Sequence, residues 1–306
     1  MSEAAALAVD RPGRIILRGV LDLRRRLPLG RPAPSAAPAA EALKARGYRF
    51  RSVDYPGAAE SLIFDTNGTT AVGTLIFEPG NSFSPATAFT FAGGDYAILG
   101  VPNATLSVAT AITSGGLIVG IFQDLGGVLR GFTNDGGTFA TVDFPGASST
   151  QIIGVNDAGQ LVGDFLDAAN VEHGFVNTGG VFTAINVPGA TSTGVTAINS
   201  AGDMVGIFSD AAGSHGFLLR GGAFTPIDVP GATSTSVFGI NDGGEIAGFY
   251  SDSTGNNHGF ILSAGAFSIV DVAGATSTLV TRIKNNGAIT GTYTDALNEE
   301  HGMIGR

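Results

Sequence analysis

Short hydrophobic runs alternate with turns rich in glycine, asparagine and proline along most of this chain. One cycle of the pattern holds four such runs, which in one copy fall at Val195–Asn199, Met204–Ser209, Gly216–Leu219 and Ala223–Val229. Short runs bounded by turn-forming residues predict β-strands joined as hairpins, because helices need longer periodic segments. The pattern therefore predicts an all-β protein made of four-stranded units.

The cycle recurs in phase through the chain. A Pro-Gly-Ala-Thr-Ser-Thr segment, or a variant of it, opens the copies at Pro56, Pro102, Pro145, Pro188, Pro230 and Ala273. The steps between them are 46, 43, 43, 42 and 43 residues. A period of about 43 residues with four strands is typical of a β-propeller blade, whereas β-solenoids usually repeat at shorter intervals. We expect residues 47–306 to form a six-bladed β-propeller.

The two ends of the repeat region indicate how the ring closes. The last copy stops at residues 301–306, after its third strand, while residues 47–57 align with the fourth-strand segment 222–231. An N-terminal strand is therefore predicted to complete the last blade as its outermost strand, which pairs an otherwise open edge. Pro226 within a fourth strand agrees, since proline is tolerated on edge strands.

Residues 1–46 differ from the repeats in composition. They carry nine Arg/Lys against four Asp/Glu and include the Pro/Ala-rich stretch at 31–40. Arginines interrupt the only apolar segment, Ile16–Leu23, so a secretory signal peptide is not recognisable. We expect a disordered or loosely helical tail, with a functional basic tail as the alternative.

The repeats resemble those of the bacterial HAF extracellular-repeat proteins. The likeness rests on segments such as Gly239–Tyr250 followed by His258-Gly259-Phe260, and it covers about residues 47–306. The first copy departs most, at Phe77–Asn81. The resemblance implies a repeat β fold and an extracellular or periplasmic location. It implies no established activity, so it assigns no catalytic residue.

Charge and composition exclude several classes of function. Residues 47–306 carry seven Arg/Lys against 22 Asp/Glu, and such an acidic body argues against nucleic-acid binding, which requires positive surface. The chain has no cysteine, which excludes disulfides and thiolate chemistry. No apolar run is long enough to predict a membrane span. We find no cofactor motif, expect no cofactor, and expect a monomer.

All four histidines occupy one repeat position, five or six residues after an aspartate. A histidine with a carboxylate could hold a metal ion, but copies on different blades lie too far apart to share one. In the second copy Asp124 is followed by Arg130, and replacing one donor by another favours a clamp that orders the loop. The predicted structural clamps, with no metal, are Asp167–His173, Asp210–His215, Asp252–His258 and Asp295–His301.

The Asn-Asp-x-Gly segments, such as Asn156–Gly159 and Asn241–Gly244, could suggest calcium. They lack the alternating acidic ligands and the distal glutamate of an EF-hand loop. Because Asn, Asp and Gly tolerate positive φ, hairpin turns explain them.

Candidate ligand-binding residues are those that break the repeat or line the Thr/Ser-rich loops. Arg282 replaces a small residue on an innermost strand, and Lys284 replaces the Asn or Thr of other copies. The loop hydroxyls could bind a sugar or peptide, or they could satisfy loop backbone groups. The candidates are Arg282, Lys284, Arg130, Glu78, Asn81, Thr191 and Thr233.

These features favour a non-enzymatic binding or scaffold propeller, exported, that presents a loop face to a carbohydrate, a peptide or a surface partner. The alternative is a hydrolase or lyase with its site in the central funnel, since propellers host both classes. We find no nucleophile elbow, phosphate-binding loop or zinc-protease motif, which leans against an enzyme.

Overall fold

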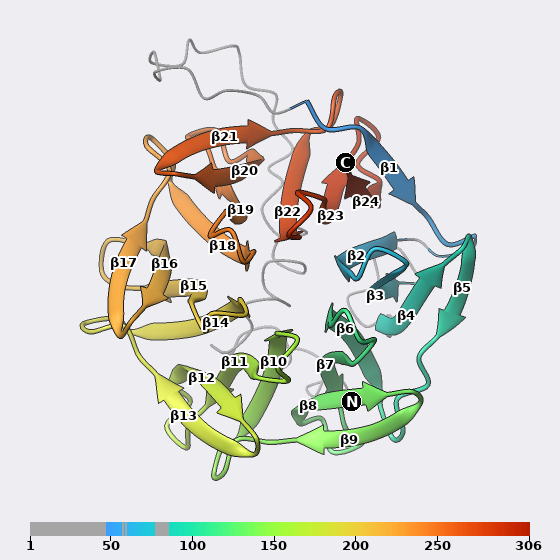
Figure 1. Cartoon of the computed structure of the whole chain (residues 1–306), viewed down its shortest axis with the longest axis vertical. Helices are drawn as coiled ribbons and strands as arrows, with labels where there is room; N and C mark the ends of the chain where they lie inside the picture. The colour runs from blue at the N-terminus through green and yellow to red at the C-terminus, as the bar shows by residue number, and fades with distance from the viewer. Residues whose placement is uncertain (1–46, 57, 59, 77–85) are drawn as a thin grey trace, which may run out of the picture.

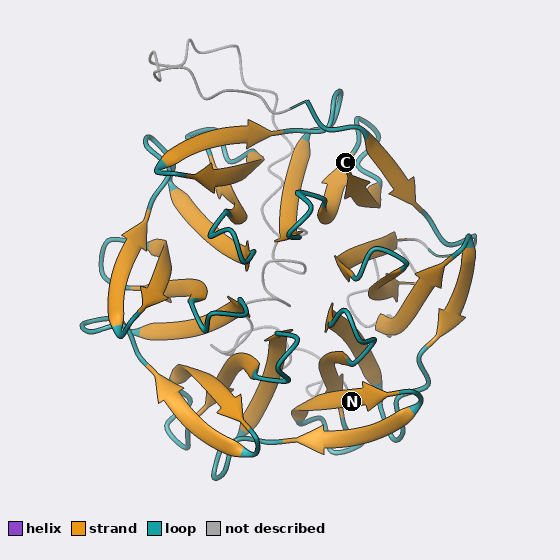
Figure 2. Ribbon diagram, viewed as in Figure 1, coloured by secondary structure: helices purple, strands orange, loops and turns teal. Residues whose placement is uncertain are grey.

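The computed structural model describes residues 47–306 except 57, 59 and 77–85. The described part of the chain consists of β-strands, loops and turns, with no helix (Figure 2). Its sheets are arranged radially around a common centre, which is the architecture of a β-propeller (Figure 1). The predicted tail at 1–46, and the candidates Glu78 and Asn81, lie outside the described residues. No described helix has the length and apolar character needed to cross a membrane.

Each sequence repeat supplies four strands, and we number the repeats as units 1 to 6. Unit 1 holds β2 (Glu60–Thr66), β3 (Thr70–Ile76), β4 (Ala86–Ala92) and β5 (Asp95–Ile98). Unit 2 holds β6 (Leu106–Ile112), β7 (Ile118–Gln123), β8 (Leu129–Asp135) and β9 (Thr138–Val142). Unit 3 holds β10 (Ser149–Val155), β11 (Leu161–Leu166), β12 (Glu172–Thr178) and β13 (Val181–Ile185).

The remaining units follow the same order. Unit 4 holds β14 (Ser192–Ile198), β15 (Met204–Ser209), β16 (Ser214–Arg220) and β17 (Ala223–Ile227). Unit 5 holds β18 (Ser234–Ile240), β19 (Ile246–Ser251), β20 (Asn257–Ser263) and β21 (Ala266–Val270). Unit 6 holds β22 (Ser277–Ile283), β23 (Ile289–Thr294), β24 (Glu300–Gly305) and, from the N-terminal end, β1 (Phe50–Val53).

The strand pairing differs in one respect from the six separate blades that the sequence predicts. Units 2 to 5 are four separate four-stranded sheets, but units 1 and 6 belong to one eight-stranded sheet. A single parallel pair, Ser61 with His301, joins β2 to β24 and merges the two. Pairing alone therefore gives four separate four-stranded blades, and the count of six is not established by it.

The predicted N-terminal closing strand is confirmed. β1 pairs antiparallel with β24, from Phe50 opposite Gly305 to Val53 opposite Gly302. Backbone bonds between Arg49 and Arg306, at 2.8 and 3.0 Å, extend the pairing by one residue. The outer edge of β24 is thereby covered by a strand from the other end of the described chain.

Within each unit the first strand lies nearest the centre and the fourth lies at the rim (Figure 1). The inner strands are buried on both faces, as in β14, whereas an outer strand such as β17 is mostly exposed. Pro226 lies in β17, at the edge of its sheet, as predicted. The loops after the second and fourth strands share one side of the ring, which we call the loop face. The turns after the first and third strands form the opposite turn face.

A buried aromatic from the third strand anchors the core of most units. Phe89, Phe132, Phe175, Phe217 and Phe260 are among the largest fully buried side chains. Met303 takes the corresponding place in unit 6 and is also fully buried. Burying side chains of this size from water is the main source of stabilisation in such a sheet stack.

The glycine inside each second strand is required by close contact with the first strand. A β-bulge in the first strand brings its carbonyl toward this position in every unit. A Cβ added at these glycines would lie only 1.8 to 2.1 Å from that carbonyl oxygen: Gly73, Gly120, Gly163, Gly206, Gly248 and Gly291.

Gly206→Ala is expected to destabilise the protein by about 2–3 kcal/mol, because overpacked cores cannot relax freely. Its Cβ would lie 2.1 Å from the Gly194 carbonyl oxygen and 2.7 Å from the Phe217 ring. Denaturant unfolding measures the change. The matched control is Gly115→Ala, whose nearest neighbour would be 3.8 Å away. Equal stability of the two variants would contradict this account of the glycine.

Candidate functional site

The histidines bridge two polar groups on the loop face, and the shorter contact is not the one that the sequence indicated. Their Nδ1 atoms contact an acid or amide at the end of the fourth strand, 13 residues downstream in three units and on the N-terminal strand in unit 6. The pairs are His173–Asn186 at 2.7 Å, His215–Asp228 at 2.8 Å, His258–Asp271 at 2.8 Å and His301–Asp54 at 3.0 Å.

The predicted partners lie farther away. The Nε2-to-carboxylate distances are 3.3 Å for Asp167–His173, 3.4 Å for Asp210–His215, 3.5 Å for Asp252–His258 and 3.6 Å for Asp295–His301. The longer of these are ion-pair distances rather than good hydrogen bonds. Each histidine therefore links its loop to the fourth strand. An Asp or Asn recurs in the sequence just after the hydrophobic residues of the fourth strand. This recurrence could have predicted the second hydrogen-bond partner of each histidine.

The same arrangement holds in unit 2 with arginine in place of histidine. Arg130 Nε donates to Asp124 at 2.7 Å, and Arg130 Nη1 donates to Asp143 at 2.5 Å. Hydrogen bonding from Arg130 is the largest cause that lowers the pKa of Asp124. A guanidinium and an imidazole thus fill the same role as a two-sided donor.

The loop aspartate also orders its own loop. One oxygen of Asp167 accepts the backbone N–H groups of Ala169 and Val171, both at 2.8 Å. Asp295 accepts those of Leu297 and Glu299 in the same way, at 2.8 and 3.0 Å. These backbone bonds are the largest cause that lowers the pKa of both aspartates. The loops are therefore held in one conformation by their first residue.

An aromatic ring from the second strand supports each histidine. The ring centroids lie 4.9 to 5.2 Å apart in the pairs Phe165–His173, Phe208–His215, Tyr250–His258 and Tyr293–His301.

Arg282 lies at the centre of the ring, and it is not exposed in a funnel. Arg282 is 7% exposed. Its Nη1 donates to the backbone carbonyl of Phe238, and its Nη2 donates to that of Ile153. Further bonds reach the carbonyls of Thr281 at 2.9 Å and Thr110 at 3.4 Å. One guanidinium therefore joins the inner strands of units 2, 3, 5 and 6. Burial lowers the pKa of Arg282, and the charge of Asp65 opposes that shift.

The small residues noted in the sequence make room for this side chain. Arg282 follows the β-bulge of its strand, and the residues at the same place in other units are Ala111, Gly154, Ala197 and Gly239. A Cβ at Gly239 would lie 2.9 Å from the Cα of Arg282. In unit 1 the position holds Asp65, whose side chain is 4% exposed.

Lys284 and Asp65 form an ion pair between units 6 and 1. Lys284 Nζ lies 2.6 Å from Asp65 Oδ1, and Asp65 Oδ2 accepts the backbone N–H of Ile112 at 3.0 Å. The Asn residues that Lys284 replaces donate instead to the next unit's backbone, as Asn156 does to Asn199 at 3.0 Å. Lys284 therefore contributes to the same chain of bonds between neighbouring units.

The loop threonines are bonded within their own units. Thr191 Oγ1 donates to the Ser209 carbonyl at 3.0 Å, and Thr233 Oγ1 donates to the Ser251 carbonyl at 3.1 Å. Of the two uses predicted for these hydroxyls, satisfying loop backbone groups is the one that the contacts show. Arg130, Arg282, Lys284 and these threonines are not gathered at one site.

The Asn-Asp-x-Gly turns are joined to neighbouring turns. Asp157 accepts the backbone N–H of Ser114 at 2.8 Å and its hydroxyl at 2.7 Å. Asp242 accepts the backbone N–H of Ser200 at 2.8 Å and the side-chain amide of Asn285 at 2.7 Å. These carboxylates link the turns of different units, which supports a structural role for the turns.

One group of potential metal ligands occurs among the described residues, and the sequence reasoning expected none. Single ligand atoms of Asp295, Glu299 and His301 lie within 4.8 Å of one another. Asp295 and His301 belong to the repeated loop arrangement, which recurs where no third ligand is present. We therefore assign no metal here.

A buried acidic pair in unit 3 was not anticipated from the sequence. Asp164 on β11 is 1% exposed and accepts from Gln151 at 2.9 Å, and Glu172 on β12 is 6% exposed. Burial is the largest cause that raises the pKa of Asp164, and the charge of Glu172 adds to it. Ile121 and Ile207 occupy the position of Asp164 in units 2 and 4. An alignment of the units would therefore have shown Asp164 as an acid at a hydrophobic position.

Comparison with known proteins establishes the fold and no family. No protein-family model matches the chain, and no curated protein matches it in sequence. Similar solved structures include AofleA from Arthrobotrys oligospora, with a TM-score of 0.54, 11% identity and 88% of each chain covered. TolB from Acinetobacter baumannii has a TM-score of 0.56 and 10% identity, over 78% of this chain and 64% of TolB.

A fucose-specific lectin from Aleuria aurantia is also similar, with a TM-score of 0.50 and 11% identity, over 83% of this chain and 90% of the lectin. At such identities the likeness shows a shared fold alone. The chain is thus a β-propeller by its strand arrangement and by its structural neighbours.

Arg282→Ala is expected to destabilise the protein by about 3–5 kcal/mol, because it leaves buried carbonyls without a donor. Denaturant unfolding measures the loss. The control is Arg220→Ala, which removes an exposed arginine paired with Asp203 and is expected to cost about 1 kcal/mol or less. Similar small losses in both variants would show that the central guanidinium is not needed for the ring.

Asp271→Asn tests the link between His258 and the fourth strand. The hydrogen bond that His258 donates to Asp271 is the largest cause that raises the pKa of His258. A raised pKa in the folded state gives stability that is present at low pH and lost as the pH rises through that pKa. The variant should therefore lose about 0.5–1 kcal/mol near pH 5.5 and little near pH 8.5.

Unfolding free energies of the wild type and variant at both pH values measure this effect. In a His258→Gln background the pH-dependent loss should disappear, since the titrating partner is gone. A loss that stays the same at both pH values would contradict the ion-pair account.

Proposed function

We propose that this chain is a non-enzymatic binding or scaffold propeller, exported, that presents its loop face to a carbohydrate, a peptide or a surface partner. The supporting observation is the order built into that face. In units 2 to 6 the loop after the second strand begins with an aspartate and is tied to the end of the fourth strand through a histidine or arginine.

Rigid loops are suited to binding because they lose little conformational entropy when a partner docks. The tips of two of these loops carry exposed apolar side chains, Leu125 at 76% and Leu297 at 77%. Val171, on the corresponding loop of unit 3, is 39% exposed. Ordered loops, some of which carry exposed apolar side chains at their tips, are suited to contact a partner.

The ring count belongs to this proposal. We propose that the eight-stranded sheet acts as two blades, because only the Ser61–His301 pair joins its halves. The loop face then has five similar loop clusters among the described residues, in units 2 to 6. One structural neighbour of this chain is a fucose-specific lectin, which supports a carbohydrate as the first ligand class to examine.

Labelled full-length protein applied to glycan and peptide arrays tests the proposal. Binding of one ligand class is expected, and Leu125→Asp with Leu297→Asp should weaken it about tenfold by placing charge at the loop tips. The control is Val181→Asp, an exposed position (69%) on outer strand β13. Binding that both variants leave unchanged, or no binding at all, would overturn the proposal. Turnover of a bound ligand would favour the hydrolase or lyase alternative.

A further inference from the structure

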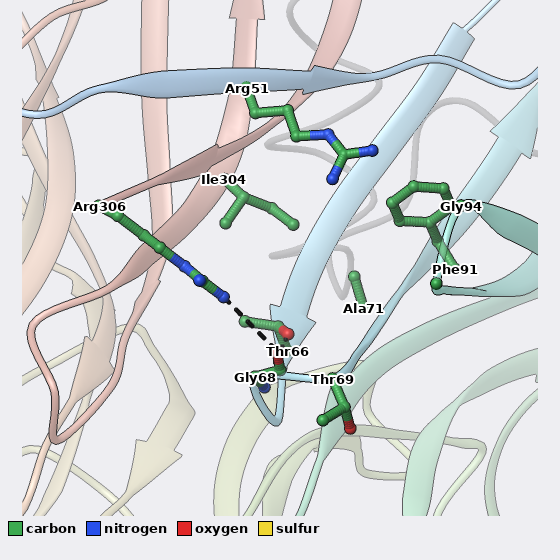
Figure 3. A pocket seen from close by; sticks show the side chains of 10 residues that line it. Arg51, Thr66, Gly68, Thr69, Ala71, Phe91, Gly94, Ile304 and Arg306 are labelled. Carbon is green, nitrogen blue, oxygen red and sulfur yellow. Dashed lines mark hydrogen bonds between the residues drawn. The ribbon is translucent and has the colours of Figure 1, made fainter.

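The turn face carries a small cleft where unit 6 meets unit 1. Its volume is about 180 Å³. Three segments far apart in sequence line it: β1 with β24, the turn between β2 and β3, and the turn between β4 and β5 (Figure 3). This cleft lies on the opposite side of the ring from the loop face, so it is separate from the function proposed above.

Two arginines enter the cleft. Figure 3 shows the side chain of Arg51 extending from β1 toward Phe91, and that of Arg306 extending toward Gly68. The Arg51 Cζ lies 5.3 Å from the centre of the Phe91 ring, and Arg306 Nη2 donates to the Gly68 carbonyl at 3.4 Å. These neutral contacts position the guanidinium groups without neutralising their charge.

Neither guanidinium has a carboxylate partner within 4.0 Å among the residues that the structure describes. By contrast, three other basic side chains do pair with carboxylates: Arg130 with Asp124 and Asp143, Arg220 with Asp203, and Lys284 with Asp65. Two unpaired arginines in one cleft therefore create a local positive site on a negative protein.

The repeat explains why Arg306 is unpaired. It occupies the position of Arg220 in unit 4, where Arg220 Nε donates to Asp203 Oδ2 at 2.8 Å. The place of Asp203 is taken by Ala288 in unit 6. Arg51 is a departure too, because the matching residues of the other outer strands are Ala97, Ala140, Thr183, Thr225 and Ser268.

We propose that this cleft binds the oxyanion group of a small polar ligand: a carboxylate, sulfate or phosphate on a molecule of about one sugar ring. Each guanidinium offers several N–H donors in a planar fork that matches two oxygens of such a group. The cleft is smaller than the usual drug-sized pocket of about 300–1,000 Å³, which limits the ligand to this size. The hydroxyl of Thr69, which is exposed in the same lining, adds a polar contact for the rest of the molecule.

Titration of the full-length protein by two-dimensional NMR at low salt tests this site. The probes are glucuronate, glucose 6-phosphate, glucose 6-sulfate and, as the neutral match, glucose. We expect the charged sugars to shift the backbone amide signals of the Thr66–Ala71 turn and of Gly93 and Gly94, and glucose to leave them unchanged. Comparing the three charged probes shows which oxyanion the site prefers. Binding should weaken as salt is added.

The double variant Arg51→Gln with Arg306→Gln should weaken binding of the charged sugars about tenfold or more. The matched control is Arg220→Gln, which removes the equivalent but paired arginine and should leave the affinity unchanged. No shift with any charged probe, or shifts that survive in the double variant, would overturn the proposal. Ligands of the loop face should bind all these variants equally, so the two proposals fail independently.

Discussion

The buried guanidinium of Arg282 is the most demanding interaction in the ring. A charge without water needs several hydrogen-bond acceptors, and here backbone carbonyls on inner strands of four units supply them. The inner strands of units 2 to 5 carry Ala or Gly at the matching position, which leaves room for the carbonyls to converge on this side chain. Inner-strand spacing, small residues and the buried charge therefore depend on one another.

Bonds between adjacent units extend this constraint around the centre. Thr110, Thr196 and Thr281 donate their hydroxyls to the backbone of the next unit at 2.8 to 2.9 Å. The Lys284–Asp65 ion pair then connects the last unit to the first. Hydrogen bonds and an ion pair thus connect the units at the centre of the molecule. The surfaces available for recognition are the loop face and the turn face.

The sequence predicts the repeated features well and the unique ones poorly. The phase of the turns gave the four-stranded units and the outer position of Pro226, and the alignment of the ends gave β1 as the closing strand. These follow from local pattern, which a repeat multiplies. Units 1 and 6 merge into one sheet through a single pair, Ser61 with His301. No repeated sequence pattern predicts a single contact between distant residues.

Site residues show the same division. The donor in each loop was found from its repetition, but its closer partner on the fourth strand was not. Arg282 stood out as a departure, yet whether a long side chain at the centre meets solvent or carbonyls depends on the width of the ring. Asp65 escaped notice because the turn that follows it is two residues shorter than in the other copies. The cleft at Arg51 and Arg306 requires the two ends to be adjacent in space.

The pairing of β1 with β24 also has a consequence for biosynthesis. The ribosome makes β1 well before β24, so the growing chain carries a strand whose partner does not yet exist. Contacts between such distant segments form late, because closing a long loop costs entropy before it gains contacts. Until then both the first strand and the edge of the last sheet are open to other chains. Assembly of this ring therefore favours conditions in which newly made copies are kept apart until the final strand emerges.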